Sequence, residues 1–416
     1  MRKLILSSLL FISIITYSQN NRVIEWDADL NFLKIELPKN HFKLYNSKSE
    51  KDFFYGIHQI AQEKNKLSDM DIAIKLQQLI ASFGDSHTMV GWKQLADNKK
   101  IIPCNLYWFN DGFYVMNTTE ENQSILGCKI LKMNDIPLTV ILDSLSTLIT
   151  LDNNAVLKND LPKLFPYVQL LEHFGFIETE TINLLLENQK GELLNYELKH
   201  GVMNKQNISS FKPDSIALCY KNLKQYFVDS ILRKDAAYYI QYNVCASREF
   251  PLQGFKGDTQ QLPSFYEFKK KVIETIKNNN FNKVIFDIRF NAGGNSLPGT
   301  ELIRELSAIK KVNTKGKLYV IIGRQTFSSA ILNAMDFNKM TQAIFVGEET
   351  SGKPNHFGEI KILELPNSGL KIQYSTTYFK NSTIDLKTIT PDYLIETSFK
   401  DFKEGHDPVY DWIVKQ

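Results

Sequence analysis

The chain lacks the features that mark metal-binding, nucleic-acid-binding and membrane-spanning proteins. Its 416 residues include four cysteines, with no CxxC pair and no histidine at zinc-finger spacing, so we expect no metal site. The 49 Lys and Arg against 46 Asp and Glu leave a net charge of +3, too little to predict a nucleic-acid partner. No apolar run reaches the roughly 20 residues that span a bilayer. The 43% hydrophobic content instead predicts a globular protein with a substantial core.

The N-terminus has the pattern of a secretory signal peptide. Arg2 and Lys3 precede an apolar run over 4–15, and Thr16-Tyr17-Ser18 places small residues at the two positions that a signal peptidase reads. We therefore predict residues 1–18 to be a signal peptide, cleaved before Gln19. No cysteine stands at the cut, so no lipid anchor is indicated, and we expect an exported protein, periplasmic or secreted.

The four cysteines, Cys104, Cys128, Cys219 and Cys245, all lie beyond the predicted cut. An oxidising compartment permits disulfides, and spacing alone does not identify pairs. The interpretation that we favour is four buried free thiols.

Hydrophobic periodicity divides the rest of the chain into parts with different patterns. Apolar residues recur at helical spacing in the first part, and strand-like runs, one pair of them joined by Asn110-Asp111-Gly112, dominate the second. A polar stretch without a clear period follows, and strands then alternate with helices, which indicates an α/β layer with crossover connections. The predicted domains are a helical domain (19–98), a β-rich domain (99–201), a linker region (202–236) and an α/β domain (237–416).

A serine stands where an apolar strand gives way to a helix. Residues 320–322 are apolar, a short polar turn follows, and a helix is expected to begin next to Ser328. Unpaired backbone N–H groups and the positive end of the helix dipole there favour a developing oxyanion. Serine is also a common helix N-cap, so this segment alone does not establish catalysis.

A second segment, residues 284–295, is a buried type of strand that ends in Gly293 and Gly294. Backbone N–H groups without side chains over them can approach a substrate carbonyl closely, as an oxyanion hole requires. Asp287 and Arg289 are two apart and share one face of this strand, and we interpret them as a structural ion pair.

The third segment is the loop Gly347-Glu348-Glu349-Thr350-Ser351-Gly352-Lys353. In order, the three segments resemble the signature of the tail-specific (C-terminal processing) and tricorn-core family of serine proteases: Asp-x-Arg-x-Asn-x-Gly-Gly, Thr-x-Ser and Gly-Glu-x-Thr-x-Gly-Lys. Lys353 follows Ser328 by 25 residues, the spacing that the processing enzymes of this family have. The resemblance is close over residues 237–410 and weaker in the N-terminal part.

The resemblance implies a multidomain α/β (α+β) protein with three parts. These are a helical N-terminal cap, a PDZ-like β-rich middle module and a C-terminal protease core of the ClpP/crotonase type. A PDZ-type module binds an extended peptide as an added strand, so the implied partner is a peptide or protein substrate held by its C-terminal end. A plain small β-domain remains an alternative for the middle module.

Two residues are candidates for the general base. Tricorn-like members use a histidine preceded by a serine, which matches Ser86-His87, and a carboxylate just before a Pro-Asp pair, where this chain has Asp385 instead of the glutamate of the family. Processing enzymes use the lysine that matches Lys353. A histidine is a base at neutral pH with little tuning, whereas a lysine must be desolvated, so we favour His87.

The predicted reaction is acyl transfer to Ser328, with N–H groups of Gly293 or Gly294 and of Ser329 as the oxyanion hole, and it needs no metal or cofactor. Two other readings remain. A relative without turnover would bind peptides on the same fold. An α/β-hydrolase esterase would carry its serine in G-x-S-x-G, a pattern that the residues around Ser328 do not have.

Overall fold

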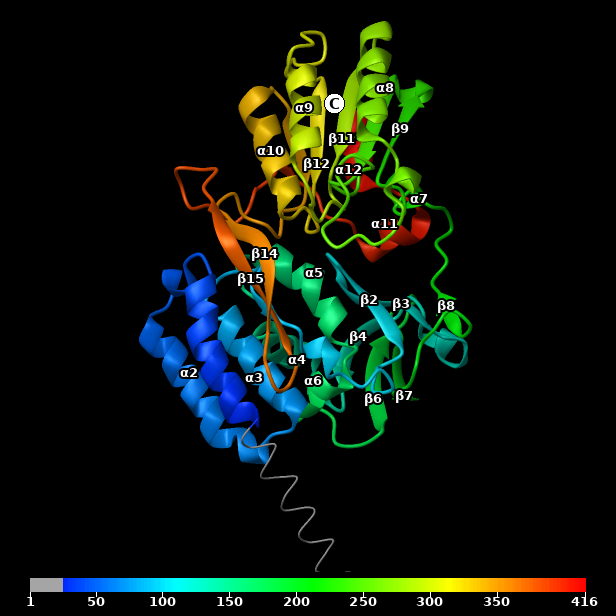
Figure 1. Ribbon diagram of the computed structural model, residues 1–416. Helices are drawn as coiled ribbons and strands as arrows, with labels where there is room; N and C mark the ends of the chain where they lie inside the picture. The colour runs from blue at the N-terminus through cyan, green and yellow to red at the C-terminus, as the bar shows by residue number, and fades with distance from the viewer. Residues whose placement is uncertain (1–24) are drawn as a thin grey trace, which may run out of the picture.

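A computed structural model describes residues 25–416, and the predicted signal peptide and cleavage site lie outside this range. The molecule has two stacked halves (Figure 1). One half holds the N-terminal helices and a seven-stranded sheet, and the other holds a six-stranded sheet with its helices. A long hairpin runs from the second half down to the N-terminal helices. No helix among residues 25–416 has the length and apolarity needed to cross a membrane.

The N-terminal helices form where the periodicity predicts them. They are the helix over 25–40, α2 (Glu50–Glu63) and α3 (Asp69–Ala81). Ser49 and Ser68 begin α2 and α3 with complete capping boxes, in which the third helical residue returns a bond to the backbone of the cap. The chain then turns and forms the two-residue strand β1 (Met89–Val90).

The seven-stranded sheet confirms the strand-rich pattern of the middle part. Asn110-Asp111 joins the first two strands, and Asn134 and Asp135 both adopt positive φ in the tight turn between β4 and β5. The strands are β2 (Cys104–Phe109), β3 (Gly112–Thr119), β4 (Lys129–Met133), β5 (Ile136–Pro137), β6 (Thr181–Glu187), β7 (Leu193–Lys199) and β8 (Ile208–Ser210). Three helices accompany them: α4 (Leu138–Ser146), α5 (Asn154–Leu164) and α6 (Val168–His173).

The six-stranded sheet has the parallel, crossover-connected core that the alternating pattern predicts. Its order is β16-β13-β12-β11-β10-β9, parallel throughout except for β9. The strands are β9 (Phe227–Leu232), β10 (Ala237–Tyr242), β11 (Lys283–Asp287), β12 (Leu318–Ile322), β13 (Ile344–Gly347) and β16 (Tyr393–Leu394). The helices of this half are α7 (Leu218–Lys221), α8 (Phe265–Asn278), α9 (Leu297–Ser307), α10 (Ser329–Met340), α11 (Phe399–Glu404) and α12 (Pro408–Val414).

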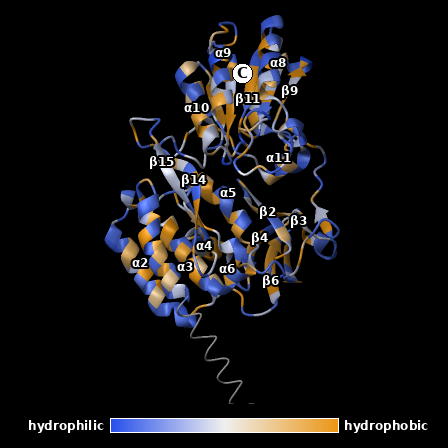
Figure 2. Cartoon of the chain, in the orientation of Figure 1, coloured by the Kyte–Doolittle hydropathy of each residue, from blue (hydrophilic) through white to orange (hydrophobic). Residues whose placement is uncertain are grey.

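Both faces of this sheet are buried, which explains why its strands read as continuous apolar runs. Tyr238 and Ile240 of β10 contribute to the core cluster that also contains residues of α8, α9 and α10. Ala237 and Tyr239 contribute to the opposite cluster with α12. Figure 2 shows the hydrophobic strands between the helices of this half.

The segment expected to be a linker region, 202–236, contains two strands and an α-helix. Strand β8 pairs with β3, α7 follows, and β9 pairs along its length with β10. The segment thus joins the two sheets and contributes one strand to each. Its strands have a weak periodic pattern because β8 has no buried residue and β9 has one, Phe227.

The hairpin of β14 (His356–Glu364) and β15 (Lys371–Phe379) joins the halves. Its turn, Pro366-Asn367-Ser368-Gly369, consists of residues typical of hairpin turns. Strand β15 pairs with β1, and Leu370 and Ile372 are buried in the hydrophobic core of the N-terminal half. The C-terminal part of the chain therefore supports the segment that begins at His87.

All four cysteines are free and buried, as the favoured interpretation predicted. Burial raises the pKa of the Cys104 thiol to about 11 and that of Cys245 to about 12, so both are protonated at neutral pH.

Candidate active site

Ser328 occupies the sharp turn between β12 and α10. Its φ of 51° and ψ of −124° are a conformation that non-glycine residues rarely adopt and that costs about 1–3 kcal/mol. The next residue, Ser329, begins α10, so the Ser328 hydroxyl stands at a helix N-terminus, as predicted. Such strain persists only where the surrounding structure enforces it.

Hydrogen bonds between two loops enforce the turn. Thr326 Oγ accepts from the backbone N–H of Gly323 at 3.1 Å and donates to the Ile288 carbonyl at 2.9 Å. The Phe327 N–H donates to the Asn291 carbonyl at 3.0 Å. The loop with the serine is therefore tied to the loop that follows β11.

His87 reaches Ser328 from the other half of the molecule. Its Nε2 lies 3.3 Å from Ser328 Oγ, a separation of 241 residues in the chain. Nucleophile–base pairs are typically about 2.6–3.2 Å apart and are often longer without substrate. The imidazole stacks on Phe327, with ring centroids 4.7 Å apart, and faces His356 at 5.9 Å on a nearly parallel plane.

Burial decides the protonation state of His87. The residue is 9% exposed, and burial lowers its pKa to about 4; the charge of Asp85 opposes this shift, and His356 adds to it. Burial likewise lowers the pKa of His356. Both imidazoles are therefore neutral at pH 7, the state in which His87 can accept a proton.

Asp85 fixes the turn that carries His87. Its carboxylate accepts from His41 Nε2 at 2.9 Å, from Thr88 Oγ at 2.5 Å and from the backbone N–H of His87 at 2.8 Å. Burial raises the pKa of this carboxyl, but the hydrogen bonds outweigh burial and hold the pKa below its usual value. His41 Nδ1 accepts from the Lys43 N–H, so the neutral ring carries its proton on Nε2 and donates it to Asp85.

The hairpin holds the same turn from the opposite side. Gln373 Nε2 donates to the His87 carbonyl at 2.9 Å, and the Ser375 N–H donates to Thr88 Oγ at 3.3 Å. The β1–β15 pairing begins at the next residue, Met89, opposite Gln373. The position of His87 thus depends on a contact between parts of the chain almost 300 residues apart.

Lys353, the alternative base, has a different partner. Its Nζ lies 2.6 Å from Asp152 Oδ1, and both side chains are largely buried. Burial raises the pKa of the Asp152 carboxyl, and the charge of Lys353 opposes the rise. The neighbouring Asn153 donates to the carbonyls of Thr350 and Ser351, so this contact anchors the lysine loop to the β-rich part. No hydrogen bond joins Lys353 to Ser328 in the described chain.

The two glycines of the predicted oxyanion hole differ. The Gly293 N–H donates to Asn291 Oδ1 at 2.9 Å, so this donor is occupied, contrary to its expected role. Among residues 25–416, the N–H groups of Gly294 and Ser329 have no protein acceptor. Ser329 Oγ donates to the Gly294 carbonyl at 2.6 Å and so fixes the orientation of that residue. A Cβ at position 293 would lie 2.8 Å from the Ser328 Cβ, which explains the need for glycine there.

The structure does not bring Asp385 to His87. Asp385 is exposed in the loop after β15, and its charge contributes to raising the pKa of Tyr378. His87 Nδ1 is buried and has no hydrogen-bond partner among the described residues. Ser86 is half-buried, and its hydroxyl makes no hydrogen bond to any of residues 25–416. Among the described residues, neither Asp385 nor Ser86 makes the hydrogen bond to the His87 imidazole that an orienting role would require.

Asp287 and Arg289 form the structural ion pair that the sequence suggested. Arg289 Nε lies 2.9 Å from Asp287 Oδ2, and the guanidinium also binds Asp407 through two bonds of 3.0 and 2.8 Å. Asp407 is the N-cap of α12, so the triad fastens that helix to the end of β11. The described residues contain no cluster of three or more His, Cys, Asp or Glu suited to a metal ion.

No protein-family model and no curated protein sequence matches the chain. Solved structures do. A structure of mature CPAF complexed with lactacystin matches with a TM-score of 0.63 at 13% identity, over 95% of this chain and 97% of that one. Another of mature CPAF matches with a TM-score of 0.58 at 13% identity, over 95% and 96%. The chain therefore has the overall fold of CPAF, and the predicted multidomain α/β architecture is confirmed.

Several residues that support the site do not belong to the three sequence motifs. Asp85 stands two residues before His87 in the same polar turn, which could have suggested a bond to a backbone N–H. His41, Asp152 and Gln373 carry no local signal, because their partners are distant in sequence.

Proposed function

We propose that the chain is a serine protease of the tail-specific and tricorn-core group, with Ser328 as nucleophile and His87 as general base. The observation that carries the proposal is the approach of a neutral, buried imidazole to a strained serine hydroxyl at 3.3 Å. The fold, shared with CPAF, and the three ordered motifs support the same class.

His87 Nε2 removes the proton as Ser328 Oγ attacks a peptide carbonyl. The oxyanion is stabilised by the N–H groups of Gly294 and Ser329, at the N-terminus of α10. The imidazolium that forms is stabilised by the negative charge of Asp85 and by the face of Phe327. His87 then donates its proton to the leaving amine, and water releases the acyl group from Ser328. Lys353 holds the loop by its pair with Asp152.

The substrate in this proposal is a peptide or protein outside the cytoplasmic membrane. The β-rich module acts as a PDZ-like domain that binds the C-terminal end of the substrate as an added strand, and the α/β half is a core of the ClpP/crotonase type. Export rests on the signal pattern of residues 1–18, which lie outside the described range.

The test is covalent labelling of the purified protein with a fluorophosphonate, which phosphonylates an activated serine. We expect wild type and Ser307→Ala to be labelled and Ser328→Ala not to be, because Ser307 lies at the end of α9. A folded wild type that is never labelled between pH 4 and 9 would overturn the proposal. Peptide binding by that protein would then favour a relative without turnover.

A further inference from the structure

A cavity of about 720 Å³ opens beside the candidate nucleophile. Gly293 and Gly294 form part of its wall, and Gly293 packs directly against Ser328. The volume lies within the roughly 300–1,000 Å³ typical of ligand sites. Because the wall includes the proposed oxyanion loop, a side chain next to an attacked carbonyl has this space within reach.

The lining is apolar and aromatic. None of the described residues around the cavity has a charged side chain. The polar residues include Asn243, but its Nδ2 already donates to the carbonyls of Asn222 and Gln225. The other polar lining groups, the Gln325 amide and the Tyr107 and Tyr220 hydroxyls, are uncharged. A charged substrate side chain would lose much of its hydration here without gaining a partner of opposite charge, whereas a large apolar one would be buried favourably.

Both halves of the molecule build the wall. Tyr107, Phe109 and Met116 come from β2 and β3 of the seven-stranded sheet, and they face residues of the α/β half, including Phe290 and Leu252. The β-rich module therefore supplies part of the surface that surrounds the cavity at the nucleophile.

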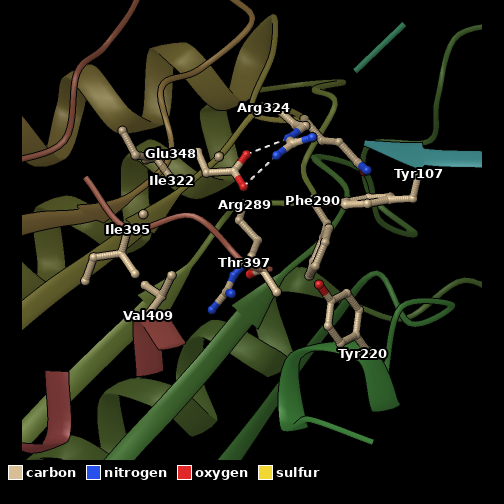
Figure 3. Close-up of a pocket in the computed structure, with 13 residues that line it drawn as sticks. Tyr107, Tyr220, Arg289, Phe290, Ile322, Arg324, Glu348, Ile395, Thr397 and Val409 are labelled. Atoms are coloured by element: carbon tan, nitrogen blue, oxygen red, sulfur yellow. Dashed lines mark hydrogen bonds and ion pairs between the residues drawn. The ribbon is translucent and has the colours of Figure 1, made fainter. Parts of the chain in front are cut away.

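Arg324 holds the two halves together at this place. Its guanidinium binds both oxygens of Glu348, at 2.6 and 2.8 Å, lies 5.2 Å from the centre of the Tyr107 ring and donates to the Trp108 carbonyl. Figure 3 shows the Arg324–Glu348 pair together with Tyr107, Phe290 and Tyr220. These three aromatic residues line the small pocket in that view and the larger cavity as well.

From this arrangement we infer that the cavity is the primary specificity site, that it accepts a large apolar or aromatic side chain on the residue whose carbonyl Ser328 attacks, and that Tyr107, Phe109 and Met116 select it. The inference rests on the proposed function and adds the substrate class. The β-rich module thus has a role in cleavage-site selection in addition to peptide capture.

The experiment compares inactivation rates with aminoalkyl diphenyl phosphonates that carry the side chain of Phe, Leu, Ala, Lys or Glu. In this reaction Ser328 Oγ forms a bond to phosphorus, phenoxide leaves, and His87 accepts the hydroxyl proton. We expect the Phe and Leu reagents to react about 100-fold faster than the Lys and Glu reagents. Equal rates for all five would overturn the inference.

Two variants test whether the cavity residues cause the preference for apolar side chains. Met116→Trp fills the cavity, and we expect the ratio of Phe to Ala rates to fall at least about tenfold. Leu252→Glu places a charge on an exposed lining residue and should lower the Phe rate by a similar factor. The matched control is Ile231→Glu on β9, where the native residue has a similar exposure. An unchanged preference in both variants would contradict the assignment.

The fluorophosphonate separates the two levels of failure, because it carries no amino-acid side chain. A wild type that does not react with it fails the proposed function itself. A wild type that reacts with it but shows no preference among the five phosphonates fails only the specificity inference.

Discussion

The turn at His87 and the loop at Lys353 supply the two candidate bases, and their side chains have opposite surroundings. The imidazole is neutral, stacked on an aromatic ring and directed at Ser328. The Lys353 amine lies 2.6 Å from a buried carboxylate, Asp152, and away from Ser328. A group that must accept a proton needs the first environment, and one that anchors a loop needs the second.

The largest effect that would test this comparison is the loss of His87. We expect His87→Ala to lower the rate of peptide cleavage or fluorophosphonate labelling on the order of 10⁴-fold, because the serine loses its base. His58→Ala, an exposed histidine on α2, is the control and should react as wild type does. Labelling of His87→Ala at the wild-type rate would return the role of base to Lys353.

We expect the loss of Lys353 to lower the stability of the protein more than its reactivity. Lys353→Ala leaves the Asp152 carboxylate buried without a partner, at a cost of about 3 kcal/mol in the free energy of unfolding. The double variant Lys353→Ala/Asp152→Ala removes both charges, so we expect it to regain most of this stability and more than a tenth of the wild-type rate. Urea unfolding and labelling measure the two effects. A stable double variant without activity would show that the lysine is needed for chemistry.

The pH profile is the next test. With a His87 pKa of about 4, the base is deprotonated above this value and kcat/KM falls as the pH drops through it. An exposed histidine would give the same fall near pH 6.5. Burial also disfavours protonation of folded His87, so its contribution to stability is full above pH 6.5 and is lost as the pH falls toward 4. An acid limb at 6.5 would contradict the buried, neutral state.

A smaller effect is expected for Asp85, which touches His87 only through its backbone. Asp85→Asn removes a negative charge that favours the imidazolium, so we expect kcat to fall about 10- to 100-fold and the acid limb to move to lower pH. The matched control is Asp71→Asn, which alters a histidine–carboxylate contact remote from the site, Asp71 with His173 at 2.7 Å. A fall in activity without a shift of the limb would mean that Asp85 serves folding alone.

The smallest effect belongs to Asp385. Because this residue is exposed and makes no contact with His87, Asp385→Asn should change kcat/KM by less than about twofold. Steady-state kinetics at pH 7 measures it. A loss of tenfold or more would show that the loop after β15 moves to His87 when substrate binds.

Much of the fold could be predicted from the sequence because its signals are local. Apolar runs located β11 and β12, the turn at Ser328 located the start of α10, and Asn110-Asp111 located a hairpin. Strands β8 and β9 were missed, since partly exposed strands carry a weak pattern.

The candidate site likewise has features that depend on local sequence and features that depend on distant residues. The sequence by itself located Ser328 at a turn between a strand and a helix, because that arrangement is local. Only the tertiary structure decided which base reaches it, that Gly293 is not a free donor and that Asp385 stands apart. These outcomes depend on partners far apart in the chain, such as His87 and Gln373 at 286 residues, and on burial, which no single segment encodes.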